Sequence, residues 1–214
     1  MKYNPEIQAV HEPVLRQALG SDWSSLARVI QAHYGVTPFT DEQIHLQGMM
    51  DHVSYSSVAA LLMPFAVFTG ALVPYRGRNV PVQAVNQSMP GRPEYFWSRT
   101  FYFPDKEPFT FRSAMICTDE YELTEYVRFG LGIRLSVAAE KGGLVERDLG
   151  YVWKIGRWSI PLPIHLILGR STIEEMPISD TEYEMKWTVT HPLFGETFAY
   201  SGRFMIVSRT YVEE

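Results

Sequence analysis

Apolar and polar residues alternate through most of residues 80–154, and short breaks rich in glycine, proline or polar residues interrupt the alternation. The breaks fall at 89–93, 104–108, 118–120, 130–132 and 140–143. A period of two is the pattern of a β-strand with one buried face. Breaks of about three to six residues are too short for a crossover, so the segment predicts a sequential antiparallel meander. A meander of this length is expected to curl or close, because its edges would otherwise be unprotected.

Strands are also predicted outside the meander, at 44–54, 171–178, 182–190 and 196–208. Between the meander and the last three strands, Trp158–Pro163 contains two closely spaced prolines. Proline removes a backbone donor and fixes φ, which excludes both a regular helix and a central strand from this segment. A short helix is predicted at 164–168, ending at Gly169.

Helical patterns occupy the N-terminal segment 1–35, where Pro5 and Pro13 mark helix starts and Gly20 marks an end. A second helical pattern lies at 58–69. Its apolar run of 11 residues is interrupted by Pro64 and is shorter than the roughly 20 residues needed to span a bilayer. We interpret it as a buried helix rather than a helix on a membrane surface.

Together these elements predict an α+β fold. Its main feature is a large, curved, mainly antiparallel sheet of nine to ten strands, forming a barrel or half-barrel. The N-terminal helices and the 58–69 helix are expected to cover its open side. Nothing in the composition suggests a linker, so residues 1–214 are expected to form a single domain, with a helical segment over 1–35 and a β-rich body over 41–208.

Composition refines this picture. Aromatic residues make up 14% of the chain, which favours strands and apolar pockets. The net charge of −5 and the lack of a basic run argue against a nucleic-acid partner. The single Cys117 excludes an internal disulfide. The N-terminus lacks the apolar core of a signal peptide, and a cytoplasmic location is expected.

Hairpin register predicts which side chains meet across the sheet. If the 104–108 loop closes directly, Arg99 lies opposite Ser113. If the 118–120 turn closes directly, Ser113 lies opposite Glu125. These three residues would then form one row on the apolar face of the meander, with the small serine leaving room for the two long side chains to meet.

A buried charge requires partners, so this row has two interpretations. The first is a buried Arg–Glu bridge that completes the core or sets the register. The second is a polar anchor inside an apolar cavity, which is typical of small-molecule sites. Trp97 and Phe101 lie on the same face. Tyr200, on the last strand, is either a core residue or a second inward hydroxyl.

Specific catalytic motifs are missing from the sequence. The six histidines do not have the spacing of helical metal ligands, and the phosphate-loop, dinucleotide-loop and nucleophile-elbow patterns are missing too. We therefore predict no metal and no cofactor. Glu174, Glu175 and Asp180 are interpreted as a solvated group near a strand end.

The leading hypothesis is a protein that binds a small apolar or amphipathic ligand in a barrel-like cavity. The candidate ligand-binding residues are Arg99, Ser113, Glu125, Trp97, Phe101 and Tyr200. One alternative is an enzyme that uses Glu125 or Tyr200 in proton transfer in the same cavity. The other is a protein-interaction domain with a solid core.

Several short segments resemble one bacterial family, the domain-of-unknown-function family DUF4166. They are Leu19–Trp23 with Leu26, Trp97–Phe101, the Gly130 and Gly132 break, Gly142–Leu144, Leu162–Pro163, and His191–Gly195 with Tyr200–Gly202. The resemblance covers roughly residues 18–208, and its motifs are mostly turn and packing residues. It implies a shared fold and no particular activity. Family members occur alone or fused to membrane or dehydrogenase-like parts, and this chain resembles the stand-alone form.

Overall fold

The predicted meander is present, and each of its strands pairs antiparallel with the next. A computed structural model describes residues 11–211, so the helix start expected at Pro5 lies outside the described residues. The meander strands are β2 (Val80–Gln87), β3 (Tyr95–Phe101), β4 (Phe109–Asp119), β5 (Glu122–Tyr126), β6 (Leu131–Glu140) and β7 (Gly143–Ile155).

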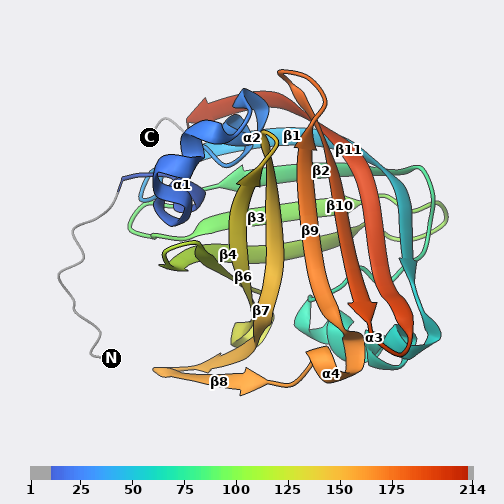
Figure 1. Cartoon of the computed structure of the whole chain (residues 1–214). Helices are drawn as coiled ribbons and strands as arrows, with labels where there is room; N and C mark the ends of the chain where they lie inside the picture. The colour runs from blue at the N-terminus through green and yellow to red at the C-terminus, as the bar shows by residue number, and fades with distance from the viewer. Residues whose placement is uncertain (1–10, 212–214) are drawn as a thin grey trace.

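The sheet closes into a barrel because both of its ends meet at β7 (Figure 1). The remaining strands are β1 (Glu42–Tyr55), β8 (Trp158–Leu162), β9 (Arg170–Pro177), β10 (Glu182–His191) and β11 (Gly195–Tyr211). The order runs from β6 through β1 to β11, β10, β9 and β7, and β6 also pairs with β7. Ten strands thus form a closed barrel, which confirms the predicted fold class. The eleventh, β8, pairs only with β7, as expected for a proline-containing edge strand.

One end of the barrel is covered by the N-terminal helices α1 (Val14–Leu19), η1 (Gly20–Ser25) and α2 (Arg28–His33). Successive connections of an antiparallel sheet alternate between its two ends, so the β4–β5, β6–β7 and β9–β10 turns share this end. The Tyr121 backbone N–H in the first turn donates to Ala18 O at 2.9 Å. The Ala27 N–H donates to Gly142 O in the second turn at 2.7 Å.

The opposite end carries α3 (Ser57–Thr69), η2 (Arg128–Gly130), the β7–β8 hairpin, α4 (His165–Leu168) and the β10–β11 turn, at the bottom of Figure 1. The Ser56 hydroxyl caps α3 by accepting from Ala59 N–H, and Gly70 ends the helix with a φ of 72°. The helices therefore cover the two ends of a closed barrel rather than one open side.

The predicted three-residue row was wrong by two residues in each hairpin. Trp97, not Arg99, pairs with Ser113, and Glu125 pairs with Met115. The first loop is longer than expected because β3 ends at Phe101, and the second hairpin contains a bulge near its turn. A shift of two preserves parity, so the predicted inward faces are retained while the neighbours change.

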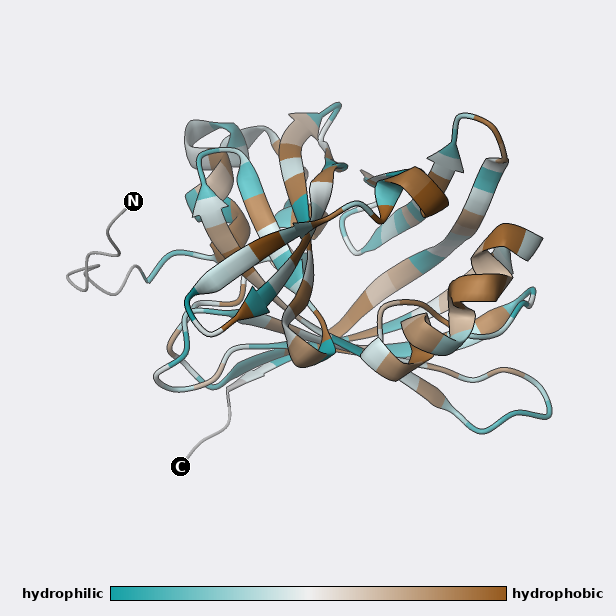
Figure 2. Ribbon diagram, turned by 90° about the horizontal axis from the view of Figure 1, so that it is seen from below, coloured by the Kyte–Doolittle hydropathy of each residue, from teal (hydrophilic) through white to brown (hydrophobic). Residues whose placement is uncertain are grey.

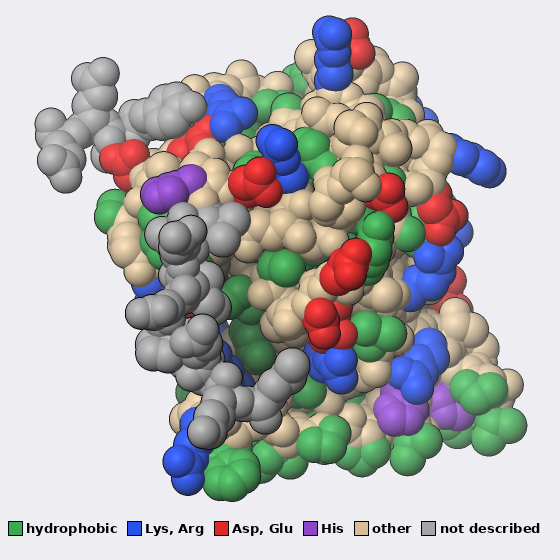
Figure 3. All heavy atoms as spheres, turned by 60° about the vertical axis from the view of Figure 1, so that its left-hand side comes forward, with side chains coloured by type: hydrophobic (Ala, Val, Ile, Leu, Met, Phe, Trp, Pro, Cys, Tyr) green, Lys and Arg blue, Asp and Glu red, His purple; other side chains and the backbone are tan. Residues whose placement is uncertain are grey.

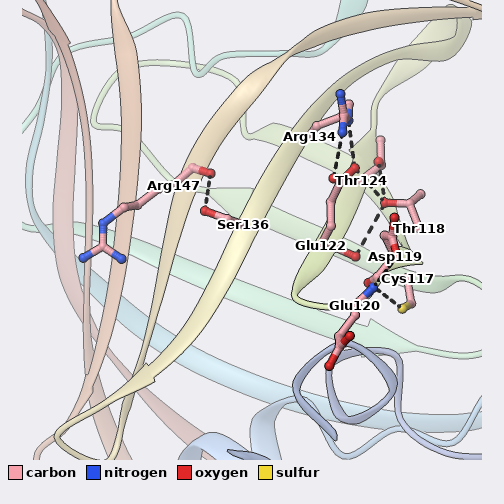
Figure 4. A network of polar contacts seen from close by, with 9 residues as sticks. All are labelled: Cys117, Thr118, Asp119, Glu120, Glu122, Thr124, Arg134, Ser136 and Arg147. Carbon is pink, nitrogen blue, oxygen red and sulfur yellow. Dashed lines mark hydrogen bonds and ion pairs between the residues drawn. The ribbon is translucent and has the colours of Figure 1, made fainter.

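Outside the barrel, polar side chains bond to one another across β4, β5, β6 and β7 (Figure 4). Arg134 Nε and Nη2 donate to the two carboxylate oxygens of Glu122, both at 2.7 Å. The Ser136 hydroxyl donates to Arg147 O at 3.2 Å. This polar outer surface leaves the inner face of the same strands for the core.

Helix α3 is only partly buried, which corrects the interpretation of 58–69 as a buried helix. Ala59 and Ala66 face the barrel, whereas Leu61, Phe65 and Phe68 are exposed. A helix with apolar residues all round can bury only the side that meets the sheet. Within residues 11–211, no helix combines the length and the apolar character needed to cross a bilayer.

Candidate functional site

A cavity of about 280 Å³ lies inside the barrel, just below the range of roughly 300–1,000 Å³ for small-molecule sites. Helices α3 and α4 contribute to its walls, which places it beneath the end opposite the N-terminal helices. Most of its lining is apolar: Leu62, Phe65, Ala66, Leu72, Val127, Leu131, Ile133, Ile164, Ile167, Leu168, Ile173, Met185, Val189 and Phe198.

Four of the six candidate residues line this cavity: Trp97, Arg99, Glu125 and Tyr200. Ser113 does not line it, but the Ser113 hydroxyl donates to Glu125 Oε1 at 2.5 Å. Phe101 is fully buried in the surrounding core, with its ring edge-on to Tyr200 at 6.4 Å. The structure thus brings the candidates close together, although through a register other than the predicted one.

Arg99 is a buried cation that stacks on an aromatic ring. Its guanidinium carbon lies 3.6 Å from the centroid of the Trp97 ring, a cation–π contact. No acid in the described part of the chain lies within ion-pair distance of Arg99, so the direct bridge to Glu125 is not formed. Burial lowers the pKa of Arg99, but Tyr200 and Glu125 outweigh it, so the pKa stays above its usual value. The guanidinium is therefore charged.

Three buried carboxyl groups accompany this cation: Glu125, Glu146 and Glu175. Burial, with the nearby Glu175 and Glu125, raises the pKa of Glu146 well above its usual value. Burial raises the pKa of Glu175 to about 7, although Arg99 partly opposes this. The raised pKa favours the protonated form of Glu146, and at neutral pH the carboxyl of Glu175 is about half protonated.

His33 is the last residue of α2, and its buried side chain lies in the barrel interior beneath the N-terminal helices. Its Nε2 lies 3.6 Å from Glu175 Oε2. Asn86 Nδ2 donates to His33 Nδ1 at 3.1 Å, and the Tyr183 hydroxyl lies 3.1 Å from the same nitrogen. Burial, followed by the charge of Arg99, lowers the pKa of His33 to about 3. The imidazole is therefore neutral at physiological pH.

Buried polar atoms without a hydrogen-bond partner among residues 11–211 are concentrated in this interior. Buried polar groups are nearly always paired, so such a concentration is unusual. Five of the seven atoms belong to residues just described: Trp97 Nε1, Arg99 Nη2, Glu146 Oε1 and both carboxylate oxygens of Glu175. A sixth is the hydroxyl of Tyr34, whose ring lies edge-on to that of His33 at 4.5 Å. Trp97, Arg99 and Glu146 also line the cavity, so donors and an acid group are available to an occupant.

Glu175 was wrongly placed with Glu174 and Asp180 on a solvated face. Its side chain is almost completely buried inside the barrel. The signal was present in the sequence, because Glu175 has the same parity as Ile173 on an alternating strand.

Sequence reasoning also missed His33 and Glu146. Glu146 lies two residues after Leu144 on β7, so both side chains point to the inner face. The alternation in the sequence could have predicted this. No local pattern marks His33, because its partners Asn86 and Tyr183 lie on distant strands.

The cavity end of the barrel is surrounded by exposed apolar side chains, which we call the apolar rim. Figure 2 looks onto this end, and in Figure 3 hydrophobic side chains gather along the lower edge of the molecule. The rim comprises Leu61, Phe65, Phe68, Phe129, Trp153, Ile155, Trp158, Ile160, Leu166, Ile167, Leu193 and Phe194.

The site is a cavity with mostly apolar walls and one polar region. Within residues 11–211, no group of three or more His, Cys, Asp or Glu side chains is arranged to hold a metal ion. The arrangement can accommodate an apolar body and bond a polar group to Arg99, Trp97 or Glu146.

Comparison with known proteins identifies a family without identifying an activity. No protein of curated function matches the sequence. One family model, described as "Domain of unknown function (DUF4166)", matches residues 26–204, which is most of the chain. The segments that resembled this family lie largely within the matched region, and the chain belongs to the DUF4166 family.

Proposed function

We propose that the barrel binds a small amphipathic molecule, with its apolar part in the cavity and its polar end near Arg99. The observation that carries this proposal is an apolar cavity lined by Arg99 and Trp97, each of which has a buried polar atom without a hydrogen-bond partner. Ligand sites typically combine apolar walls with a small number of placed polar groups. The cavity also favours ligand binding over an interaction domain with a solid core.

The polar atoms suggest the chemistry of the bound group. Arg99 and Trp97 can only donate hydrogen bonds, so the ligand must offer an acceptor. Glu146 can donate to the same group in its protonated form, or accept from a hydroxyl. Burial raises the pKa of Tyr200 to about 12, so its phenol keeps its proton. A carboxyl, carbonyl or hydroxyl head group meets these requirements.

Filling the cavity is expected to abolish ligand binding without unfolding the protein. Wild-type protein should bind a fatty acid or an apolar fluorescent probe with a micromolar dissociation constant, about −8 kcal/mol. Ile133→Trp places a larger ring at a half-buried lining position and should weaken probe binding at least tenfold. Fluorescence titration measures both.

Thr188→Trp is the matched control, because Thr188 lies on the outer face of β10 and does not line the cavity. The proposal fails if neither ligand binds the wild type, or if the two tryptophan variants bind equally well. Native mass spectrometry of protein purified from its host would identify a retained ligand directly.

Recognition of the head group is expected to depend on Arg99. Arg99→Lys keeps a positive charge but loses the planar fork of donors. It should weaken binding of a fatty acid about tenfold while leaving the fatty alcohol of the same chain length nearly unchanged. Titration calorimetry with both ligands measures the difference, and Arg112→Lys, on the exposed face of β4, is the control. Equal losses for the acid and the alcohol would argue against an anionic head group.

A further inference from the structure

The apolar rim exposes more hydrophobic surface than scattered surface residues would explain. Eight of its side chains are more than half exposed, and they come from α3, η2, β8, α4 and the β10–β11 turn: Leu61, Phe65, Phe68, Phe129, Trp158, Leu166, Leu193 and Phe194. Contiguous apolar patches of this kind mark interaction sites in soluble domains.

Contacts between these segments join the rim into one surface, and α3 packs beside α4. The rings of Phe68 on α3 and Phe129 on η2 stack at 4.9 Å. Trp153 Nε1 on β7 donates to Phe129 O at 2.9 Å. His191 Nε2 lies 3.1 Å from Leu166 O, which joins the β10–β11 turn to α4. The segments that carry the rim therefore adjoin one another at the cavity end of the barrel, which faces the viewer in Figure 2.

The charge of the rim is opposite to that of the whole chain. The chain segments that carry the rim are 57–70, 127–132, 153–169 and 192–195. They contain the exposed cations Arg128, Lys154 and Arg157, and they contain no aspartate or glutamate. The nearest acid in the sequence is Glu196, which follows the last of these segments. The whole chain has a net charge of −5, whereas these segments are locally positive because they contain no acid.

We propose that the apolar rim docks on an anionic lipid bilayer surface, with the cavity end of the barrel facing the lipid. Exposed Phe, Leu and Trp side chains would enter the interface between head groups and acyl chains, where tryptophan is favoured. The rim cations complement anionic head groups. A second copy of the chain is a poorer partner, because two basic rims would repel each other. Docking requires no ligand in the cavity, so it goes beyond the proposed function.

Vesicle co-sedimentation tests the docking proposal. Wild-type protein should bind vesicles of phosphatidylcholine and phosphatidylglycerol in equal parts, and bind vesicles of phosphatidylcholine alone more weakly. The double variant Leu61→Ser, Trp158→Ser removes two exposed apolar side chains from the rim and should reduce binding at least tenfold. Because both residues are exposed, the urea unfolding midpoint should change little.

The control is Ile178→Ser, Val207→Ser, which removes two apolar residues that are each about half exposed and lie away from the rim. Ile178 lies in the β9–β10 turn at the opposite end of the barrel, and Val207 lies on the outer face of β11. This variant should bind vesicles like the wild type. Equal losses in the two double variants would contradict a specific role for the rim.

The electrostatic part of the proposal has its own test. Arg128→Gln with Arg157→Gln should weaken binding to the anionic vesicles by about fivefold for each charge removed. Binding to phosphatidylcholine vesicles should stay the same. Added salt should reduce the wild-type affinity for anionic vesicles.

Two results would overturn the docking proposal: failure of the wild type to bind anionic vesicles, and a protein dimer that dissociates when the rim is changed. The first would exclude a bilayer partner, and the second would make the rim a subunit interface. Ile133→Trp separates docking from ligand binding, because it should lose the soluble probe and keep vesicle binding. Loss of vesicle binding in this variant would mean that docking depends on the cavity.

Discussion

Arg99→Met is expected to lower the free energy of unfolding by about 3–5 kcal/mol at neutral pH. Arg99 is the only lysine or arginine among the buried side chains of residues 11–211, and Glu125 and Glu175 both interact with its charge. Its removal would leave a buried carboxylate without a compensating cation. The loss should be smaller at acidic pH, where the carboxyl groups become protonated.

Urea unfolding at neutral and acidic pH measures this effect. The double variant Arg99→Met, Glu125→Gln should recover part of the loss, because it removes an acid together with the cation. Arg112→Met, on the outer face of the neighbouring strand, is the control and should change stability little. Wild-type stability in the Arg99→Met protein would mean that this cation does not balance the buried acids.

Glu175→Gln is expected to stabilise the protein above neutral pH, by up to about 3 kcal/mol relative to the wild type. The pKa of Glu175 is raised from an ordinary value of 4.5 to about 7 in the folded protein. The folded state therefore holds its proton more tightly than the unfolded state. The resulting stabilisation is fully present below about pH 4.5 and is lost as the pH rises to about 7. Glutamine stays neutral and does not show this loss.

The measurement is the difference in unfolding free energy between the two proteins at a series of pH values. Burial lowers the pKa of His33 to about 3, which makes the protein more stable as pH rises and works against the Glu175 effect. To a first approximation the His33 contribution is common to both proteins and cancels in the difference. Glu184→Gln, exposed on β10, is the control. A wild-type-to-variant difference that does not change between about pH 4 and pH 8 would rule out titration of Glu175 in this range.

The strand pattern was readable from the sequence because it is local. Alternation placed Trp97, Arg99 and Glu125 on the inward face, and the structure confirms that all three are buried. The closely spaced prolines after Trp158 predicted a segment outside the central sheet, and β8 is an edge strand. These predictions depend on parity and on backbone donors, which belong to each segment separately.

Which inward residues meet was decided only by the tertiary structure. Two extra residues in each hairpin left Arg99 stacked on Trp97 instead of bridging Glu125. A shift of two residues keeps each side chain on the same face of the sheet but gives it a different neighbour on the next strand. The loop conformation sets this register.

The sequence by itself therefore determined the meander, the inward faces and the edge strand. Closure of the barrel, the insertion of His33 beside Glu175 and the gathering of distant apolar loops around one cavity end were decided only by the tertiary structure. The physical reason is range. Backbone geometry and alternation act over a few residues, whereas burial raises the pKa of Glu175 and leaves Arg99 Nη2 unpaired only after strands far apart in the sequence have packed together.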